Sequence, residues 1–450
     1  MTAKVSLIYA DNNFQTVGEF PPLGGLYIIS FLKQKGIDAN YHDFPIIKNW
    51  KKRIHEILDS NPDVIGLSST VSNYSNTQFL ARYIKSFNKD IKIIVGGPYP
   101  TGVPEKYLQN EAIDAICMGE GEHTLYKYLI EGDKADGLMI RKNGHFFRTK
   151  PRPRIENLDD LPFPDLSQVD LRKYHYIFKK RKPLSTIMTS RGCPYNCIYC
   201  FHEVHGHKWR ARSPKNVLEE IKWQYREFGV RELAFWDDNL TMDQKRAEKI
   251  CDLLIQEKVD ISMSTPNGIR VDKVNKILLS KMRRAGFWVI VLTPETGDPY
   301  IMEKLRKGFT LKQTERVARW CKELDLFLVI YLMMGFPFET KEHVQNSLNF
   351  IKKIKPDIFN VNKFYPFPKT PIVNEYDLKT DEDYDYRIKK MSKEFEKLLN
   401  SAYFQFFSNP HNLANIIRKV GVRRFFYSIY RVFKADITNR FKRTDYSKMV

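Results

Sequence analysis

Three cysteines close together in the sequence are the residues of this chain best suited to metal or redox chemistry. Cys193, Cys197 and Cys200 follow a C-x3-C-x2-C spacing. Thiolates are soft ligands that select iron–sulfur clusters, copper(I) or zinc. Three thiolates on a four-iron cluster leave one iron open, and an open iron is useful where a substrate or cofactor binds to it. The spacing therefore favours a catalytic iron–sulfur cluster.

Zinc is the alternative that the same residues leave open. A structural zinc site needs four closed ligands, and His202, His205 and His207 follow the cysteines closely enough to supply the fourth. These histidines are also typical of a polar loop over a cluster. Because histidine titrates near neutral pH, His202 and His205 are candidates for a general base.

The other cysteines predict no disulfide framework. Cys117, Cys251 and Cys321 are scattered in apolar surroundings, which is typical of small buried hydrophobic residues. The N-terminus opens on an apolar run, residues 4–9, that indicates a strand rather than a signal peptide. The sequence contains no run of about 18 apolar residues, so it predicts no transmembrane helix. We therefore expect a cytoplasmic protein.

The segment that carries the cysteines follows the first strand of a regular αβ alternation. Helical patterns separate six strand candidates, which are residues 185–189, 232–236, 261–264, 288–292, 327–333 and 358–361. This pattern predicts a partial (β/α)6 TIM-like barrel over residues 183–390. The chemistry of such a barrel lies at the carboxyl ends of its strands.

An earlier alternation, over residues 1–137, predicts a separate α/β domain with a doubly wound, Rossmann-like parallel sheet. Its strand candidates are residues 5–9, 38–43, 64–68, 91–95 and 115–118. Polar or glycine-rich turns follow three of them, and ligands bind at this edge of such sheets. No G-x-G-x-x-G follows the first strand, which argues against a dinucleotide.

Two further segments complete the predicted organisation. Residues 138–182 contain Asn143-Gly144 between two apolar runs, a strong hairpin signal, and then a proline-rich linker. Residues 391–450 form a basic tail that we expect to be helical, with ten Lys or Arg against two Asp or Glu between positions 411 and 450.

The cysteine segment, its place after the first barrel strand and the aromatic Tyr199 resemble the radical S-adenosylmethionine (SAM) superfamily. The resemblance implies that Cys193, Cys197 and Cys200 hold a [4Fe–4S] cluster whose open iron is chelated by SAM. It also implies that Tyr199 lies against the adenine of SAM. By the same resemblance, Asp238 and Glu295, which follow later strands, face this cofactor.

With this match, the first domain resembles the cobalamin-binding domain that precedes the barrel in one branch of the superfamily. The turns that carry the resemblance contain the implied cofactor-binding residues, which are Gly24, Ser68, Ser69, Thr70, Gly96, Gly97, Gly119 and Glu120. Cobalamin domains often have Asp-x-His-x-x-Gly after the first strand. This chain has Asp11-Asn12-Asn13 there, which implies cobalamin held without a histidine ligand.

The resemblance implies a cobalamin-dependent methyltransferase that acts on an unactivated carbon. An adenosyl radical would remove a hydrogen, methylcobalamin would deliver the methyl group, and two SAM molecules would be consumed. The alternatives are a radical rearrangement, cyclisation or oxidation without methyl transfer, and a non-catalytic iron–sulfur protein. A reductant protein such as a flavodoxin or ferredoxin is an expected partner.

The net charge of +20 favours anionic partners. We expect a small-molecule or lipid-linked anionic substrate, and the aromatic residues of the basic tail raise the hypothesis of peripheral membrane contact. The sequence disfavours nucleic acid, because no recognisable nucleic-acid module accompanies the charge. The competing interpretation of the tail is a helical cap on the barrel.

Overall fold

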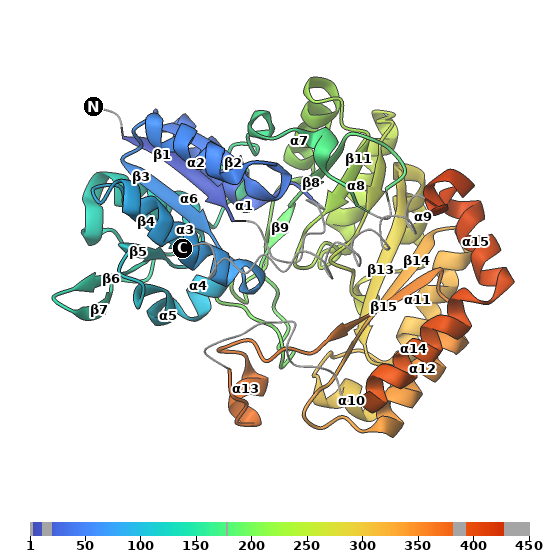
Figure 1. The fold of residues 1–450 in the computed structure, drawn as a ribbon. Helices are drawn as coiled ribbons and strands as arrows, with labels where there is room; N and C mark the ends of the chain where they lie inside the picture. The colour runs from blue at the N-terminus through green and yellow to red at the C-terminus, as the bar shows by residue number, and fades with distance from the viewer. Residues whose placement is uncertain (1–2, 11–19, 177–178, 381–392, 427–450) are drawn as a thin grey trace.

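The computed structural model describes residues 3–10, 20–176, 179–380 and 393–426. It contains two α/β parts joined by an extended linker, with two further helices packed on the second part (Figure 1). The segment Asp11-Asn12-Asn13 and the end of the basic tail lie outside the described residues.

The first part is a seven-stranded sheet with the order β2-β1-β3-β4-β5-β6-β7. Neighbours from β2 to β5 pair in parallel, and β6 and β7 add an antiparallel hairpin at the edge. Its strands are β1 (Lys4–Tyr9), β2 (Asp38–Asp43), β3 (Val64–Ser68), β4 (Lys92–Gly96), β5 (Ala115–Cys117), β6 (Leu138–Lys142) and β7 (His145–Arg148). The predicted doubly wound sheet is confirmed.

Helices cover both faces of this sheet because its strands are apolar on both sides. Val5 and Leu7 of β1 point into a core shared with one pair of helices, whereas Ile8 points into the core on the other face. The first pair is α1 (Leu23–Gln34) and α6 (Gly121–Glu131), and the other face carries α2 (Trp50–Asp59), α3 (Tyr74–Phe87), α4 (Pro98–Gly102) and α5 (Pro104–Leu108).

The hairpin at Asn143-Gly144 forms as predicted, but its strands extend the first sheet instead of standing apart in the linker. Ala115 of β5 pairs with Ile140 of β6. The linker that follows is irregular, as its prolines require. Leu166, Leu171 and Tyr174 of this linker are buried in the same core that lies under α1 and continues into the second part. The two α/β parts therefore share apolar packing.

The second part is a six-stranded sheet with the order β15-β14-β13-β12-β11-β8, in which all neighbours are parallel. It is the expected partial barrel. Its strands are β8 (Leu184–Ile187), β11 (Glu232–Phe235), β12 (Ser262–Ser264), β13 (Phe287–Glu295), β14 (Phe327–Met334) and β15 (Ile358–Lys363). The helices outside them are α7 (Pro214–Glu227), α8 (Gln244–Gln256), α9 (Lys276–Ala285), α10 (Pro299–Lys304), α11 (Leu311–Glu323) and α12 (Lys341–Ile354).

The first part touches both ends of this open barrel. At the β8 end, the Thr186 hydroxyl donates to the Pro21 carbonyl at 3.1 Å. Beyond β15, Phe367 packs edge-on against Tyr99 of α4, with ring centroids 5.7 Å apart. Short α13 (Pro371–Glu375) follows this contact (Figure 1). The carboxyl ends of both sheets therefore lie toward the boundary between the two parts.

Two helices of the tail pack on the barrel. In α14 (Lys393–Phe407), the Tyr403 ring stacks on Phe359 of β15. In α15 (Pro410–Val420), Ile416 is buried against Trp288 and Phe327, which begin β13 and β14. α15 therefore covers the amino end of the barrel (Figure 1). Within the described residues, no helix is long and apolar enough to cross a membrane.

Candidate cluster and cofactor site

The cysteine loop begins and ends in a small two-stranded sheet. β9 (Ser190–Arg191) pairs antiparallel with β10 (Arg210–Ala211), so that residues 192–209 form a closed loop at the carboxyl end of β8. The Cys193 amide donates to the Gly206 carbonyl at 3.2 Å, and the Cys200 amide donates to the Cys197 carbonyl at 3.0 Å. The loop therefore holds the cysteines through its own backbone.

Gly192 is the residue that lets this loop close. Its φ is +85°, which is the left-handed region that L side chains rarely adopt. A Cβ at this position would lie 2.4 Å from the Lys208 carbonyl oxygen and 3.0 Å from that of Gly206. Only glycine fits here, which gives a physical reason for Arg-Gly-Cys at the start of the motif.

The three cysteines lie in a partly buried, electropositive environment. Cys197 is buried, whereas Cys193 and Cys200 are half-buried. A hydrogen bond from the Cys200 thiol, together with the nearby cations Lys307 and Arg270, lowers the pKa of Cys197 to about 6. The same hydrogen bond raises the pKa of Cys200, and burial raises that of Cys193. Cys197 is therefore the cysteine held as the thiolate, which is the form that binds iron. This donor set fits an iron–sulfur cluster.

The histidines of the loop have other partners. His202 stacks on His207, with ring centroids 4.1 Å apart, and His205 Nδ1 lies 2.9 Å from Asp238 Oδ2. Within the described residues, no three His, Cys, Asp or Glu side chains are placed to hold one metal ion. A cluster has no such requirement, because each of its cysteines binds a different iron.

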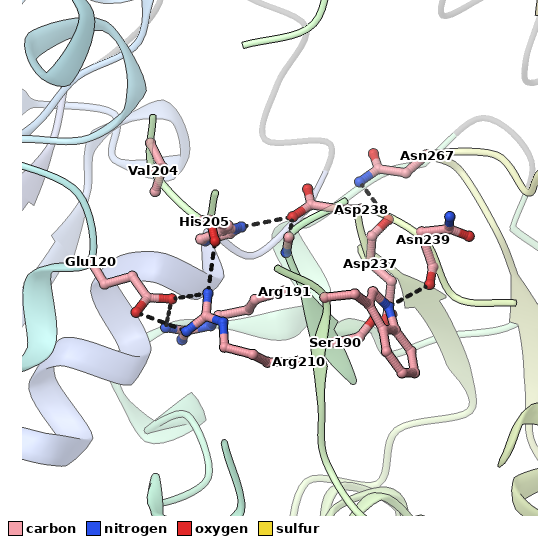
Figure 2. Close-up of polar contacts among 12 residues, drawn as sticks. Glu120, Ser190, Arg191, Val204, His205, Arg210, Asp237, Asp238, Asn239 and Asn267 are labelled. Carbon is pink, nitrogen blue, oxygen red and sulfur yellow. Dashed lines mark hydrogen bonds and ion pairs between the residues drawn. The ribbon is translucent and has the colours of Figure 1, made fainter. Parts of the chain in front are cut away.

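Asp238, at the end of β11, contacts the cysteine loop instead of standing free. One of its carboxylate oxygens accepts both from His205 and from the Gly192 amide, at 2.7 Å. Burial acts to raise the pKa of Asp238, but the hydrogen bonds from His205 and Gly192 outweigh it and lower the pKa. Its buried neighbour Asp237 accepts hydrogen bonds from Thr189 and Ser190 at 2.6 Å. Both carboxylates thus support the loop (Figure 2).

Tyr199 and Glu295, which the sequence places 96 residues apart, are brought together beside the cysteines. The Tyr199 hydroxyl donates to Glu295 Oε1 at 3.2 Å, and Lys307 Nζ donates to the Tyr199 hydroxyl at 2.9 Å. Glu295 is buried and has φ of +67°. Burial raises the pKa of Glu295, although the nearby Lys307 ammonium acts against it.

Sequence reasoning missed Lys307 as a member of this site. Its side chain is 7% exposed, and its ammonium lies 3.5 Å from Glu295 Oε1. A buried lysine is rare unless it is paired, but the run Lys304-Leu305-Arg306-Lys307 contains three basic residues, and nothing in the sequence distinguishes the one that turns inward. The sequence did not single out Arg270 either, and its guanidinium stacks 3.3 Å from the ring centroid of Tyr195.

The predicted cobalamin-binding turns lie along one edge of the first sheet, but their side chains contribute unequally. Ser69 is fully buried, and its hydroxyl contacts Asn73, Thr77 and Tyr107 at 2.6–3.0 Å. The Thr70 hydroxyl contacts Ser72 at 2.8 Å. The half-buried residues of these turns include Ser68, Thr70, Gly96, Gly97 and Gly119, whereas Gly24 is exposed in the first turn of α1.

This edge lies against the barrel close to the cysteine loop. A Cβ on Gly102 of α4 would lie 3.3 Å from the ring of Phe367 and 3.4 Å from that of Phe201, the residue after Cys200. A Cβ on Gly119 would lie 3.8 Å from the Val204 carbonyl. The carboxyl edge of the first sheet therefore packs directly beside the cysteine loop, with half-buried backbone groups at this boundary.

Glu120, the last of the predicted cobalamin-binding residues, forms ion pairs with two arginines. Its carboxylate contacts Arg210 at 2.9 Å and Arg191 at 3.3 Å, and all three side chains are at most 5% exposed. Figure 2 shows Glu120 pointing toward both guanidinium groups, which come from β9 and β10. The structure thus places Glu120 at the junction of the two parts.

Comparison with known proteins divides the chain in the same way. Residues 187–351 match the family model of the Radical SAM superfamily, and residues 12–129 match that of the B12 binding domain. A protein of Pyrococcus horikoshii described as an uncharacterized methyltransferase is 30% identical over 416 residues, which are 87% of this chain and 88% of that protein.

Other relatives are more distant. An anaerobic magnesium-protoporphyrin IX monomethyl ester cyclase of Cereibacter sphaeroides is 25% identical over 82% of this chain, and the match covers 62% of that enzyme. The solved structure of the radical SAM methyltransferase TsrM of Kitasatospora setae, with cobalamin and a [4Fe–4S] cluster bound, superposes with a TM-score of 0.69 at 17% identity. This superposition covers 83% of this chain and 74% of that one.

The two family matches lie on the two parts of the fold, and the cysteine loop lies inside the second match. The cofactors of the protein are accordingly a [4Fe–4S] cluster, SAM and cobalamin. The chain belongs to the radical SAM superfamily, among its cobalamin-binding enzymes of the methyltransferase type.

Proposed function

We propose that this enzyme transfers a methyl group from SAM to an unactivated carbon of a small or lipid-like anionic substrate. The observation that carries the proposal is the meeting of the two cofactor edges, because Gly119 and Gly102 of the first part lie against residues 201–204 of the cysteine loop. Methyl transfer from one cofactor to a carbon made reactive by the other requires both cofactors to face one substrate, and the closeness of the two edges supports such an arrangement.

In this proposal Cys193, Cys197 and Cys200 hold the cluster, and the side chains beside them bind SAM. Lys307 supplies a buried positive charge for the carboxylate of SAM, and Glu295 an acceptor for its amino or hydroxyl groups. The low exposure of both supports this assignment, since ionic contacts strengthen where water is excluded. Tyr199 supplies an aromatic face near Phe336, with ring centroids 6.2 Å apart.

Cobalamin is proposed to lie against Ser68, Gly96, Gly97 and Gly119, held by backbone groups more than by side chains. Gly97 has φ of +113°, and a Cβ there would lie 2.4 Å from the Ser69 carbonyl. The turn after β4 therefore packs directly on the turn after β3. Ser69 and Thr70 support the shape of this edge through their contacts within the protein.

The cluster, when bound and reduced, supplies the electron that cleaves SAM. Each turnover would convert one substrate and two SAM molecules, with two electrons from an external reductant, into methylated product, methionine, 5′-deoxyadenosine and S-adenosylhomocysteine. We expect the electron donor to be a flavodoxin or ferredoxin.

The test of this function is anaerobic reconstitution with iron, sulfide and hydroxocobalamin, followed by desalting and analysis of iron and cobalt. Stoichiometric cobalt together with cluster iron supports the proposal. The reconstituted enzyme is then incubated anaerobically with a reduced flavodoxin, with SAM labelled in its methyl group, and with the anionic fraction of a cell extract. A labelled product that is neither SAM nor a fragment of SAM identifies the substrate. Cluster iron without cobalt would overturn methyl transfer by this route.

A second candidate is radical cyclisation or oxidation without methyl transfer. The similarity to a cyclase over 82% of the chain favours it. The labelling experiment separates the two functions, because this candidate yields 5′-deoxyadenosine and a product without the labelled methyl group. An iron–sulfur protein without catalytic activity would form no 5′-deoxyadenosine at all.

The tail bears on where the enzyme meets its substrate, and we extend the proposal to peripheral contact with an anionic membrane. Phe404, Val422 and Phe426 are 58–74% exposed, and Arg423 and Arg424 lie beside the last two. Apolar and basic groups in this mixture suit a lipid surface. Binding to vesicles containing phosphatidylglycerol but not to neutral vesicles, with loss of binding in R423E/R424E, would support this contact; equal binding to both would exclude it.

A further inference from the structure

The buried charges at the junction of the two parts form one connected group, the Glu120 cluster, made of Glu120, Glu122, Arg191 and Arg210. Glu120 accepts from Arg191 and Arg210, and Arg191 also donates to Glu122 at 2.6 Å. The glutamates belong to the turn after β5 and to α6, whereas the arginines belong to the paired strands β9 and β10. The cluster therefore joins the cobalamin side of the molecule to the base of the cysteine loop.

The linker is joined at the same point. The Ile155 amide donates to Glu120 Oε2 at 2.8 Å, and Arg210 donates to the Ile155 carbonyl. Hydrogen bonds from Arg210 and from Ile155, together with the charge of Arg191, outweigh the effect of burial and lower the pKa of Glu120. Glu120 is therefore ionised and fully occupied by protein groups.

The contacts continue from Arg210 to the residues next to the first cysteine. Arg210 Nη2 donates to the His205 carbonyl at 2.9 Å, and the His205 ring contacts Asp238. Asp238 in turn accepts from the Gly192 amide at 2.7 Å. Figure 2 shows this path as an unbroken series of contacts from Glu120 through Arg210 and His205 to Asp238.

The geometry of the Glu120 cluster is suited to holding the cysteine loop rigidly. The side chains of Glu120, Arg191 and Arg210 are 3–5% exposed, so removal of one partner leaves an unpaired charge away from water. A guanidinium donates in a fixed planar fork, which sets direction as well as distance. By contrast, Lys208 of the same loop pairs with Glu156 of the linker, and these side chains are 70% and 66% exposed. Such an exposed pair contributes little.

We infer that the Glu120 cluster is a positioning device that locks the cysteine loop against the cobalamin domain and so fixes the separation of the two cofactors. The inference rests on the proposed function in one respect, which is that both cofactors act on one substrate. Glu120 is then a positioning residue rather than a ligand of cobalamin. The effect of Glu120 reaches the iron–sulfur cluster through Arg191 and through the path from Arg210 to Gly192.

The test compares E120Q with E156Q in the full chain, first without cofactors. Hydrogen–deuterium exchange followed by mass spectrometry reports the opening of residues 192–209. In E120Q, exchange in this loop should accelerate by about tenfold or more, because a buried arginine loses its charged partner, whereas E156Q should match the wild type. Equal exchange in the two variants, or uniform acceleration across the whole protein, would overturn the inference.

The second measurement uses protein reconstituted with iron, sulfide and hydroxocobalamin. After reduction, pulsed electron paramagnetic resonance gives the distance distribution between cob(II)alamin and the reduced cluster. We expect one narrow distribution in the wild type and in E156Q, and a broadened or shifted one in E120Q at equal iron and cobalt content. An unchanged distribution in E120Q would overturn the inference.

Two further outcomes keep this inference separate from the proposed function. If neither the wild type nor the variants retain cobalt but loop exchange still accelerates only in E120Q, the proposed methyl transfer fails. The role of Glu120 in locking the loop would stand. R210K distinguishes geometry from charge, because lysine keeps the charge but cannot reproduce contacts to Glu120, Ile155 and His205 at once. R210K should therefore behave like E120Q, and recovery of wild-type exchange in R210K would contradict the positioning role.

Discussion

The Gly192 amide and Asp238 Oδ2 are joined by a hydrogen bond of 2.7 Å, which ties the residue before the first cysteine to the end of β11. The same oxygen accepts from the His205 ring, farther along the loop. One carboxylate oxygen thus holds two points of the loop that are 13 residues apart in the sequence. We therefore expect cluster binding to depend on supports outside the cysteine motif, and the first prediction follows from this expectation.

G192A should lower the cluster content of the protein even though all three cysteines remain. The added Cβ would lie 2.4 Å from the Lys208 carbonyl, so that the loop cannot close as it does in the wild type. The matched control is G229A, because Gly229 also has a positive φ, +62°, but has no atom within 4 Å of a Cβ. Iron and sulfide analysis after reconstitution should show loss in G192A and wild-type content in G229A. Equal content in both would contradict the role given to Gly192.

C197A should abolish the cluster, whereas C251A should retain it. Cys197 lies in the cysteine loop, and Cys251 is buried in the apolar face of α8 as a small hydrophobic residue. The absorbance of the reconstituted proteins in the visible range, normalised to protein, checks this expectation. A full cluster spectrum in C197A would show that another side chain replaces this ligand. His202 is the first replacement to check, by a double variant that also lacks the His202 imidazole.

K307M should weaken SAM binding without removal of the cluster. The Lys307 ammonium lies within 3.5 Å of Glu295 and 2.9 Å from the Tyr199 hydroxyl. Loss of a hydrogen bond to a charged group corresponds to an increase in Kd of at least about tenfold. K304M is the control, because Lys304 is exposed and lies over the ring of Tyr300. Equilibrium dialysis with labelled SAM measures both, and an unchanged Kd in K307M would remove Lys307 from the proposed SAM site.

H42Q should make the stability of the protein less sensitive to mild acid. Burial, with a smaller effect of Arg53, lowers the pKa of His42 from 6.5 to about 4. Below pH 6.5 the unfolded chain therefore binds a proton that the folded chain does not, and this contribution to stability is lost as the pH falls toward 4. At about pH 5 the expected loss is about 1–2 kcal/mol.

Guanidinium unfolding at neutral pH and at about pH 5 measures this difference. The fall in the free energy of unfolding should be smaller in H42Q than in the wild type. H55Q is the control, because His55 is exposed on α2 beside the ring of Phe87. If H42Q and the wild type lose the same free energy on acidification, burial of His42 has no part in the acid response.

The sequence predicted most of the fold because both sheets are signalled by local patterns. The start of α1 is harder to predict, since the helix begins at Leu23, directly after Pro22. Proline is well tolerated at the start of a helix, so its presence does not delay the first turn. The hairpin at Asn143-Gly144 was also correct, but its pairing with β5 is a contact between strands that local pattern does not encode.

The site was predictable where residues are close in sequence and not where the fold brings them together. The cysteine spacing is local, and so are the turns of the first sheet. The contact of Glu120 with Arg210 joins residues 90 positions apart, and it became visible only with the structure. A buried glutamate and two buried arginines look like surface residues in the sequence, because charge alone does not reveal burial.

The first part contacts the barrel through Pro21, which meets Thr186 of β8, and through Tyr99, which meets Phe367 beyond β15, and this has a consequence for how such enzymes are engineered. The barrel has six strands, and the cobalamin domain contacts it near both of its edge strands. The domain is therefore packed on the barrel at two separate places and is not an independent cassette. We expect a chimera that exchanges cobalamin domains between relatives to keep its two parts in register only if it retains both contacts.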